Sequence, residues 1–428
     1  MFYLIETKNQ LSKLKEKFND TMYLEFIQGN DNTHPILAEI IAVYLNVENK
    51  GYIIPFNHME CINWDKNAIL NILANYNLRV LDKKSSLHAA PQLSYTDIQH
   101  TIPPLEQHTT QAHTWYYRKF PQIKVNKIIP IGKHLERCNN KYNDIIGYTP
   151  EKTNEYVNDI LLPTLQKLEQ KGLKINDKFD DYFTTKNKKY SIKDNHIYGW
   201  YNPYTTTGRP VNNFNGINFV GLKHDNGERD CSEPDNDFFV EMDYDGYHPR
   251  LIGDIVNYQF KDNVHNELAQ IYFKTKEITP EQYKESKILT FKQIYGGINK
   301  ANLHHPFFKG IQDYTNNKWN EFQERGYIMN YCWKKIKKEN HKKMTKAKLF
   351  NYLIQSKETD QNIYTLSLIH RLLKNYKTKV VLYNYDAFIF DFCDSEYNSL
   401  FKKLKDIVSD NYPISIKKGN HYGALHKI

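Results

Sequence analysis

Cysteine is scarce in this sequence, and long apolar runs are missing from it. The 428 residues include five cysteines that lie far apart without any Cys-x-x-Cys pair, so neither a disulfide framework nor a zinc ribbon is expected. No apolar stretch approaches the roughly 18 residues of a membrane-spanning helix, and the first residues lack the apolar core of a signal peptide. We therefore expect a cytoplasmic protein with no membrane partner.

Aromatic and basic residues, by contrast, are plentiful. Aromatic residues make up 14% of the sequence and hydrophobic residues 40%, which excludes a disordered or collagen-like chain and favours several packed domains. The net charge is +9, and a lysine run against a single glutamate lies between residues 334 and 348. It includes Lys334, Lys335, Lys337, Lys338, Lys342 and Lys343. Such a run fits a polyanion such as DNA, or simply a solvated surface.

The first 125 residues show a mixed pattern of strands and helices. Residues 22–27 and 51–55 have the composition of strands, whereas 35–45 and 67–74 fit short helices. The segment 101–122 carries three prolines and many His and Thr residues, so we expect it to connect two domains.

Two aspartates at strand ends suggest a site for divalent cations. Asp243 follows the apolar strand 238–242, and Asp386 lies at the tip of a β-hairpin over 380–390. Carboxylates are ligands for Mg²⁺, and two ions about 3.5–4 Å apart can activate an attacking hydroxyl and stabilise a leaving oxygen. Aspartate is also common wherever strands end, so these residues alone leave an ordinary pair of turn acids open.

Two helical patterns carry spaced polar and aromatic residues. Lys287, Phe291 and Tyr295 recur at four-residue intervals on one helix face, which suits the phosphates, sugar and base of a nucleotide. A lysine beside two core aromatics is the alternative. Asn351 and Gln355 lie one turn apart after the lysine run, where amides fit DNA contacts or are simply exposed.

In this order, the motifs resemble those of family A DNA polymerases, the class of bacterial DNA polymerase I and many phage replicases. The resemblance covers residues 150–428 well and residues 1–125 weakly. It is carried by Thr205-Thr206-Thr207-Gly208-Arg209, Asp243-Tyr244-Asp245-Gly246-Tyr247-His248-Pro249-Arg250, Lys287-x-x-x-Phe291-x-x-x-Tyr295-Gly296, Asn351-x-x-x-Gln355-x-x-x-x-Asp360 and Tyr385-Asp386-Ala387.

The resemblance implies a role for each matching residue. Asp243 and Asp386 would be the catalytic residues and would hold two Mg²⁺ ions. The residues implied to bind the incoming deoxynucleoside triphosphate are Lys287, Phe291, Tyr295, His265, His248 and Lys284. Those implied to bind primer-template DNA are Arg209, Arg250, Asn351 and Gln355, together with the six lysines named above.

This sequence departs from the family pattern at three of these places. His248 stands where the family has a Glu that blocks a ribose 2′-hydroxyl, and Ala387 stands where it has a second acid. Tyr283, with Lys284 beside it, stands where the family has an Arg. Because imidazole and the Glu side chain have comparable volumes, we expect deoxynucleotides to remain strongly preferred.

The N-terminal part resembles the 3′–5′ exonuclease domain of the family, with a degenerate site. Glu25 and Asp82 match two of its acids, but Tyr23 stands where another acid is usual, and no further acidic motif is evident. We therefore expect no proofreading. The thumb within 126–195 would be reduced, because the polar segment left for it is too short to bury its own core.

These patterns together predict an α+β fold. We expect a right-hand polymerase with an antiparallel palm sheet, helical fingers and a reduced thumb, preceded by an α/β exonuclease-like (RNase H-like) domain. The expected domains are 1–125 (exonuclease-like), 126–195 (connector and reduced thumb), 196–254 (first part of the palm), 255–365 (fingers) and 366–428 (second part of the palm).

The expected activity is template-directed DNA synthesis on a primer 3′-hydroxyl, by a monomer that works with a processivity or replisome protein. Two alternatives remain. One is a nucleic-acid-binding accessory protein with an inactive polymerase fold, against which the retained Asp243 and Asp386 argue. The other is a relative of single-subunit RNA polymerases. Phe291 argues against it, because those enzymes resemble one another in carrying no aromatic residue at this place.

Overall fold

The computed structural model of the chain consists of two compact units. It describes residues 2–20, 22–30, 34–99, 111–120, 124–145, 155–183, 192–213, 218–222, 227–261 and 263–428. The first unit comprises Met1–Gln170 and Lys189–Gly199, and the second comprises Lys171–Lys188 and Trp200–Ile428. The connection expected at 101–122 falls mostly outside the described residues, as do residues 184–191 of the expected thumb.

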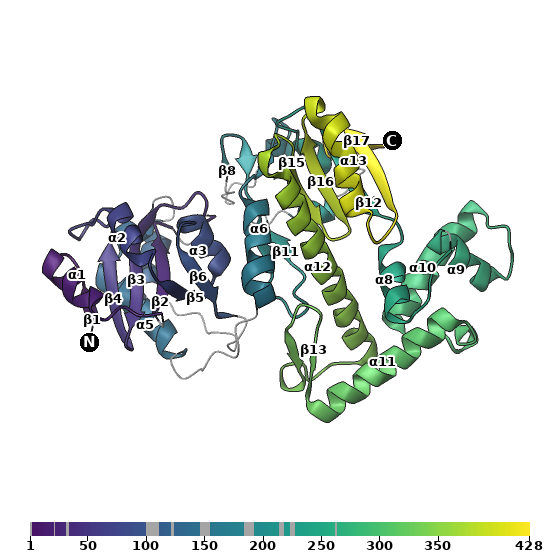
Figure 1. Ribbon diagram of the computed structural model, residues 1–428, viewed down its shortest axis with the longest axis horizontal. Coiled ribbons are helices and arrows are strands. Elements are labelled where there is room, and N and C mark those ends of the chain that lie inside the picture. Colours follow the sequence, from purple (N-terminus) through teal and green to yellow (C-terminus); the bar gives the residue numbers. More distant parts are fainter. Residues whose placement is uncertain are drawn as a thin grey trace. The chain divides into compact units, whose positions relative to one another are not determined.

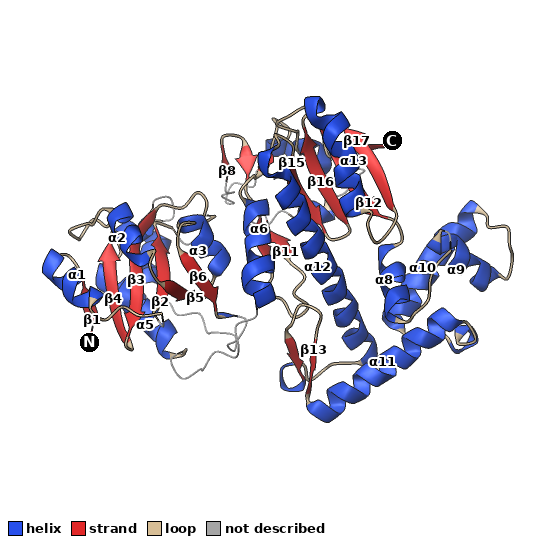
Figure 2. Cartoon of the chain, viewed as in Figure 1, coloured by secondary structure: helices blue, strands red, loops and turns tan. Residues whose placement is uncertain are grey.

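A six-stranded mixed sheet forms the centre of the first unit (Figure 2). Its strand order is β1 (Phe2–Leu4), β4 (Lys50–Pro55), β3 (Ile40–Val47), β2 (Tyr23–Gln28), β5 (Asn77–Val80) and β6 (Ser94–Asp97). Strands β2, β3 and β4 pair antiparallel, while β5 and β6 run parallel to β2, and β1 runs parallel to β4. The two strands expected from the sequence are thus confirmed as β2 and β4.

Helices pack on both faces of this sheet. On one face, α1 (Lys8–Lys15) and α2 (Lys66–Leu73) share an apolar core with Val43 of β3. On the other face, α5 (Ile131–Asn143) shares a core with Tyr44 of the same strand. Successive residues of a strand point to opposite faces, so β3 contributes to both cores. Helix α2 also confirms the helix expected over residues 67–74.

The helix expected for residues 35–45 is wrong. Most of that segment belongs to β3, and all eight residues of β3 are buried. A strand that is covered on both faces has a continuous apolar run instead of an alternating pattern. Such a run cannot be distinguished from a buried helix by its periodicity.

The remaining elements of the first unit are short. They are α3 (Lys83–Ala89), α4 (Gln111–Lys119), a π-helical segment (Tyr156–Leu161) that leads into α6 (Leu162–Glu169), and the small hairpin of β8 (Ile192–Lys193) and β9 (His196–Ile197).

The second unit is built around a five-stranded antiparallel sheet. Its order is β15 (Lys379–Asn384), β16 (Ala387–Phe392), β12 (Phe238–Tyr244), β17 (Ile414–Gly419) and β18 (His426–Lys427). The strand expected at 238–242 and the hairpin expected at 380–390 are therefore confirmed. The long helix α12 (Lys346–Leu372), which runs through this unit in Figure 1, packs against α8 (Tyr247–Ile255) and α13 (Tyr397–Val408).

Between β12 and β15 the chain forms a mostly helical region. Helices α9 (Val264–Phe273), α10 (Pro280–Gly296) and α11 (Pro306–Arg325) share an apolar core with the first half of α12. The hairpin of β13 (Tyr327–Met329) and β14 (Lys335–Lys337) follows α11. The other α-helix and strands described for this unit are β7 (Leu173–Lys174), α7 (Phe179–Phe183), β10 (Trp200–Asn202) and β11 (Val211–Asn213), and short 3-10 turns lie between the longer elements.

The ends of α10 are determined by local sequence. Thr279 caps its first turn by accepting from the main-chain N–H of Gln282, whose side chain caps Thr279 in return, and Pro280 has the φ that a first helical residue needs. Gly297 ends the helix at a φ of 112°. The helix expected around Lys287 is thus confirmed. Among the described residues, no helix has both the length and the apolar character that crossing a membrane would require.

Candidate active site

Asp243 and Asp386 lie close together at one end of the five-stranded sheet. Asp243 is in β12 and pairs with Ala387, the first residue of β16. Asp386 lies in the two-residue turn between β15 and β16, after Tyr385, which has a φ of 58°. The Tyr244 N–H donates to the Asp386 carbonyl oxygen at 3.0 Å. Strand pairing therefore brings together two acids that are far apart in the sequence.

Electrostatics at this end of the sheet favour a bound cation. Burial raises the pKa of Asp243 to about 7, and the carboxylates of Asp386 and Glu241 contribute to the rise. Loss of part of its hydration, and then the carboxylate of Glu358, raise the pKa of Asp386. A divalent cation would relieve the repulsion between these acids. Two accessible carboxylates form an oxygen-donor set that fits Mg²⁺.

A single glycine turn connects the first acid to the next helix. Gly246 has a φ of 62° and precedes α8. A Cβ at this position would lie 3.0 Å from a methyl carbon of Val264. The turn lets the chain reverse within a few residues, so that Asp243 in β12 and His248 in α8 belong to the same corner of the molecule.

His248 lies at the meeting point of three helices. One of its ring nitrogens contacts the hydroxyl of Tyr295 in α10, and the other lies 3.3 Å from a carboxylate oxygen of Glu358 in α12. The same oxygen accepts a hydrogen bond of 3.2 Å from Arg209. The guanidinium of Arg209 also lies over the ring of Tyr385, 3.6 Å from its centroid. Arg209, Tyr385 and residues of α8, α10 and α12 are thus joined in one polar network around His248 and Glu358.

Three of the residues expected to bind a nucleotide, Lys287, Phe291 and Tyr295, lie along one face of α10. Phe291 is 40% exposed, and its ring is nearly parallel to that of Tyr295 at a centroid distance of 5.9 Å. Lys287 is exposed two turns before Tyr295, and Lys284 is exposed in the preceding turn. His265 of α9 is buried, and burial together with the charge of Lys287 lowers its pKa to about 4. It is therefore neutral, with an Nδ1 atom that has no hydrogen-bond partner.

The residues expected to contact DNA lie on several elements of the second unit. Gln355 donates to the side chain of Asn351 at 3.1 Å on the face of α12. Arg250 in α8 donates to the main-chain carbonyl of Asp245 at 3.1 Å. The side chain of Lys334 donates to the carbonyl of Thr205 and is half-buried. The exposed lysines lie in and after the β13–β14 hairpin, namely Lys335, Lys337, Lys338, Lys342 and Lys343.

Sequence reasoning missed two residues of this region. Glu358 follows Asn351 by seven positions and Gln355 by three, and this helical spacing would have placed all three on one face of α12. Trp333 sits in the turn of the β13–β14 hairpin with a φ of 59° and is 61% exposed. Its position inside the lysine run was the available signal, because exposed aromatics among basic residues are typical of nucleic-acid surfaces.

The acids expected for an exonuclease site have other partners. Both carboxylate oxygens of Glu25 in β2 accept hydrogen bonds of 2.7 Å from Lys141 in α5. Asp82 caps α3 by accepting from the Ser85 N–H at 2.9 Å. Burial raises the pKa of Asp82 to about 6. The ammonium group of Lys141 therefore lies where a cation would bind Glu25.

A second cluster of side chains with metal-ligand chemistry lies in the first unit. Ligand atoms of His34, His88 and Glu169 lie within 4.8 Å of one another. The Lys84 ammonium donates to Glu169 at 2.6 Å, and the other carboxylate oxygen lies 2.9 Å from a ring nitrogen of His88. Both ring nitrogens of His34 contact main-chain atoms. Lys84 thus supplies the positive charge here, and we interpret the cluster as a buried ion-pair network.

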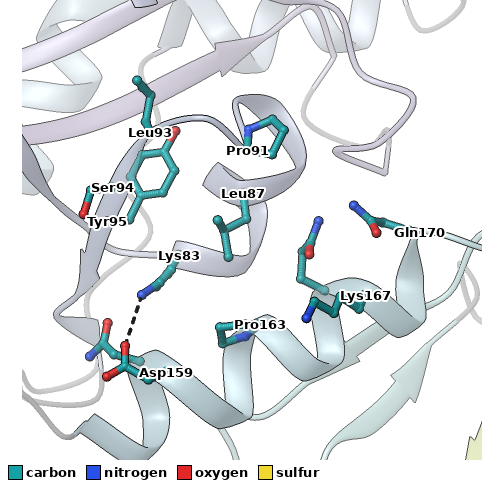
Figure 3. A pocket seen from close by; sticks show the side chains of 12 residues that line it. Lys83, Leu87, Pro91, Leu93, Ser94, Tyr95, Asp159, Pro163, Lys167 and Gln170 are labelled. Carbon is teal, nitrogen blue, oxygen red and sulfur yellow. Dashed lines mark ion pairs between the residues drawn. The ribbon is translucent and has the colours of Figure 1, made fainter. Parts of the chain in front are cut away.

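A pocket of about 460 Å³ also lies in the first unit, and Figure 3 shows its lining. The side chains come from α3, the turn after it, β6, the π-helical segment and α6, and they include Leu87, Tyr95 and Pro163. Lys83 and Asp159 face each other across one end at 4.0 Å. None of the residues expected for catalysis or nucleotide binding lines this pocket.

Comparison with known proteins identifies the fold. No family model and no curated protein matches the sequence. The structure is similar to that of the polymerase domain of Pol1 from M. smegmatis, solved in complex with a DNA primer-template and dNTP. The likeness has a TM-score of 0.69 at 12% sequence identity and covers 99% of this chain and 100% of that chain. The polymerase fold expected from the sequence is therefore confirmed: this chain has the fold of a DNA polymerase I polymerase domain.

Proposed function

We propose that this protein is a template-directed DNA polymerase that adds deoxynucleotides to the 3′-hydroxyl of a primer. The observation that carries the proposal is the adjacency of Asp243 and Asp386 at the ends of paired strands, in a chain with a polymerase fold. The two acids are difficult to explain as ordinary turn residues, because burial raises the pKa of both, and neighbouring carboxylates add to the rise: Asp386 and Glu241 for Asp243, and Glu358 for Asp386. Carboxyl groups with strongly shifted pKa values are concentrated at functional sites.

Asp243 and Asp386 would hold two Mg²⁺ ions. When bound, the ions would favour ionisation of the primer 3′-hydroxyl and neutralise charge on the triphosphate and the leaving pyrophosphate. The two carboxylates would place the metal ions at the end of the sheet. The turn at Gly246, after Asp243, places the start of α8 beside them. Ala387 adds no third carboxylate, so these two acids are the proposed minimal set.

The nucleotide would lie between the sheet end and α10. Lys287 and Lys284 supply positive charge for the triphosphate, and neutral His265 supplies a hydrogen-bonding nitrogen beside them. Phe291 and Tyr295 present parallel rings to the sugar and base. This arrangement lacks the bidentate fork of an arginine, so phosphate binding relies on point charges.

The primer-template would contact the second unit in two places: the polar network around His248 and Glu358, and the lysine-rich β13–β14 hairpin. Arg209 donates to Glu358, Arg250 donates to the main chain at Asp245, and Asn351 and Gln355 add amides on α12. Exposed lysines in and after the β13–β14 hairpin would contact phosphates. Sequence selection then comes from base pairing with the template.

We also propose that the first unit is a degenerate exonuclease-like domain without proofreading activity. The mixed sheet supports a nuclease-like ancestry, while the hydrogen bonds from Lys141 to Glu25 and the capping role of Asp82 argue against a metal site. The reduced thumb, the five domain boundaries and a processivity partner of the monomer remain proposals of the same kind.

Primer extension tests the proposal directly. A labelled primer annealed to a longer template, with dNTPs and Mg²⁺, should be extended by the wild-type protein and not by Asp243→Asn or Asp386→Asn. A parallel reaction with ribonucleotides separates a DNA polymerase from an RNA polymerase. Wild-type protein that binds the primer-template without extending it would instead indicate an accessory protein with an inactive fold.

A further inference from the structure

Glu358 of α12 carries a buried carboxylate next to His248, and none of the roles proposed so far uses it. This side chain is 1% exposed, yet it lies in the part of α12 that faces α8 and α10. One oxygen, Oε1, contacts both Arg209 at 3.2 Å and His248 at 3.3 Å. The other oxygen, Oε2, has no hydrogen-bond partner. A buried carboxylate is costly unless its partners compensate it, so these contacts hold it in place.

The contact with Glu358 determines which ring nitrogen of His248 carries a hydrogen. A carboxylate can only accept hydrogen bonds, so the ring nitrogen Nε2 of His248 must carry the hydrogen that faces it. In the neutral ring Nδ1 is then an acceptor, and it receives the hydroxyl of Tyr295. The imidazole is thereby held at both nitrogens, by α12 on one side and by α10 on the other.

Arg209 balances the negative charge of Glu358. Its guanidinium is anchored over the ring of Tyr385, next to Asp386, and supplies the charge that balances the carboxylate. That positive charge would repel a divalent cation from Oε1, which argues against Glu358 as a third metal ligand. The carboxylate is therefore available for positioning His248.

We propose that Glu358 is a positioning residue for selection of the nucleotide sugar. By holding the His248 ring of α8 between α10 and α12, it keeps the imidazole in the space that a ribose 2′-hydroxyl would need. The inference rests on the proposed function, because it assumes that the nucleotide binds along α10. Without Glu358 the ring would be free to turn away, and ribonucleotides would be accepted more readily.

The test compares dATP and ATP in single-nucleotide incorporation opposite a template thymine. For Glu358→Ala, we expect the ratio of kcat/KM for dATP over that for ATP to fall roughly tenfold, mainly through a lower KM for ATP. Glu358→Gln should keep the ratio within about threefold of wild type, because its carbonyl oxygen still accepts from His248 and its amide takes the place of the unpartnered Oε2.

A double-mutant cycle separates positioning from a general effect on the fold. If Glu358 acts through the ring, His248→Ala together with Glu358→Ala should give the same ratio as His248→Ala alone. Equal ratios for Glu358→Ala and wild type, or effects of the two substitutions that multiply, would overturn the inference. Glu358→Met, which fills the volume without an acceptor, should behave like Glu358→Ala and serves if the alanine variant does not fold.

A binding measurement makes this test independent of the proposed chemistry. With a dideoxy-terminated primer no bond can form, so the dissociation constants of dATP and ATP from the complex with primer-template can be compared directly. The preference for dATP should weaken in Glu358→Ala and persist in Glu358→Gln. Preserved preference in Glu358→Ala overturns the inference, whereas absent extension by wild type refutes only the proposed function.

Discussion

Replacing Asp243 by asparagine should make the protein more stable while it abolishes activity. In the folded chain, burial and the neighbouring acids raise the pKa of Asp243 from its ordinary 3.8 to about 7. The ionised carboxylate is therefore unfavourable in the folded state at pH 8. Asparagine has nearly the same shape and no charge, so it removes this cost along with the proposed metal ligand.

The size of the effect follows from the pKa change. At about 1.36 kcal/mol per pKa unit, a rise of this size corresponds to at most about 4 kcal/mol. Because the Asp243 side chain is partly accessible to water, solvent screening reduces the cost. We expect Asp243→Asn to raise the free energy of unfolding at pH 8 by about 1–2 kcal/mol, equivalent to a Tm increase of about 2–6 °C.

The sign of the pH dependence is a stricter test than the size. A carboxyl group whose pKa is raised on folding binds its proton more tightly in the folded state. Its destabilising effect is absent below the unfolded pKa near 4, grows through pH 5 and 6, and is complete above about pH 7. The stability gain of Asp243→Asn should therefore be at most about half as large at pH 5 as at pH 8.

Thermal unfolding of wild type, Asp243→Asn and Asp406→Asn measures the prediction. Asp406 is exposed on α13 and serves as the matched control. Added Mg²⁺ should raise the Tm of the wild type and of Asp406→Asn but not that of Asp243→Asn. An asparagine variant that is less stable than wild type at pH 8, or equally stabilised at both pH values, would refute the electrostatic reasoning. Full primer extension by Asp243→Asn would refute the catalytic role.

Three further outcomes are expected from single features of the structure. Gly246→Ala should lower primer extension at least tenfold and destabilise the protein by about 1–2 kcal/mol, because alanine is strained at this positive φ; activity and a Tm equal to wild type would contradict it. Combined Lys335→Gln and Lys337→Gln should reduce the slope of log affinity for primer-template against log salt by about 2, measured by fluorescence anisotropy, and an unchanged slope would remove these lysines from the DNA surface. The wild-type protein and Lys141→Ala should both leave a labelled single-stranded 3′ end intact in Mg²⁺, whereas shortening that Glu25→Ala abolishes would indicate a working nuclease site.

Local sequence determined the elements whose signals are short-range. The helix around Lys287 could be predicted because its apolar spacing and the glycines at its end lie within one segment, and α10 follows both. The hairpin that carries Asp386 could be predicted because two apolar strands flank a short polar turn. The motif residues could be placed on these elements because each motif lies within one element and its flanking turn.

Other features could not be predicted, because they depend on residues that pack against an element from distant parts of the chain. The fully buried run of β3 was predicted as a helix because periodicity disappears when both faces of a strand are covered, and only the packing of α1, α2 and α5 shows that it is a strand. The sequence likewise placed Glu25 at a nuclease site, but the chain brings Lys141 from α5 to neutralise it.

The candidate active site shows the same division. The sequence alone predicts that Asp243 and Asp386 follow apolar strands, but only the antiparallel pairing of β12 with β16 makes them neighbours. It also identified His248, whereas the partners of that ring come from α10 and α12, far away along the chain. A side chain reveals its chemistry in the sequence, but its pKa, its hydrogen-bond partners and its accessibility depend on groups that only folding brings within a few ångströms.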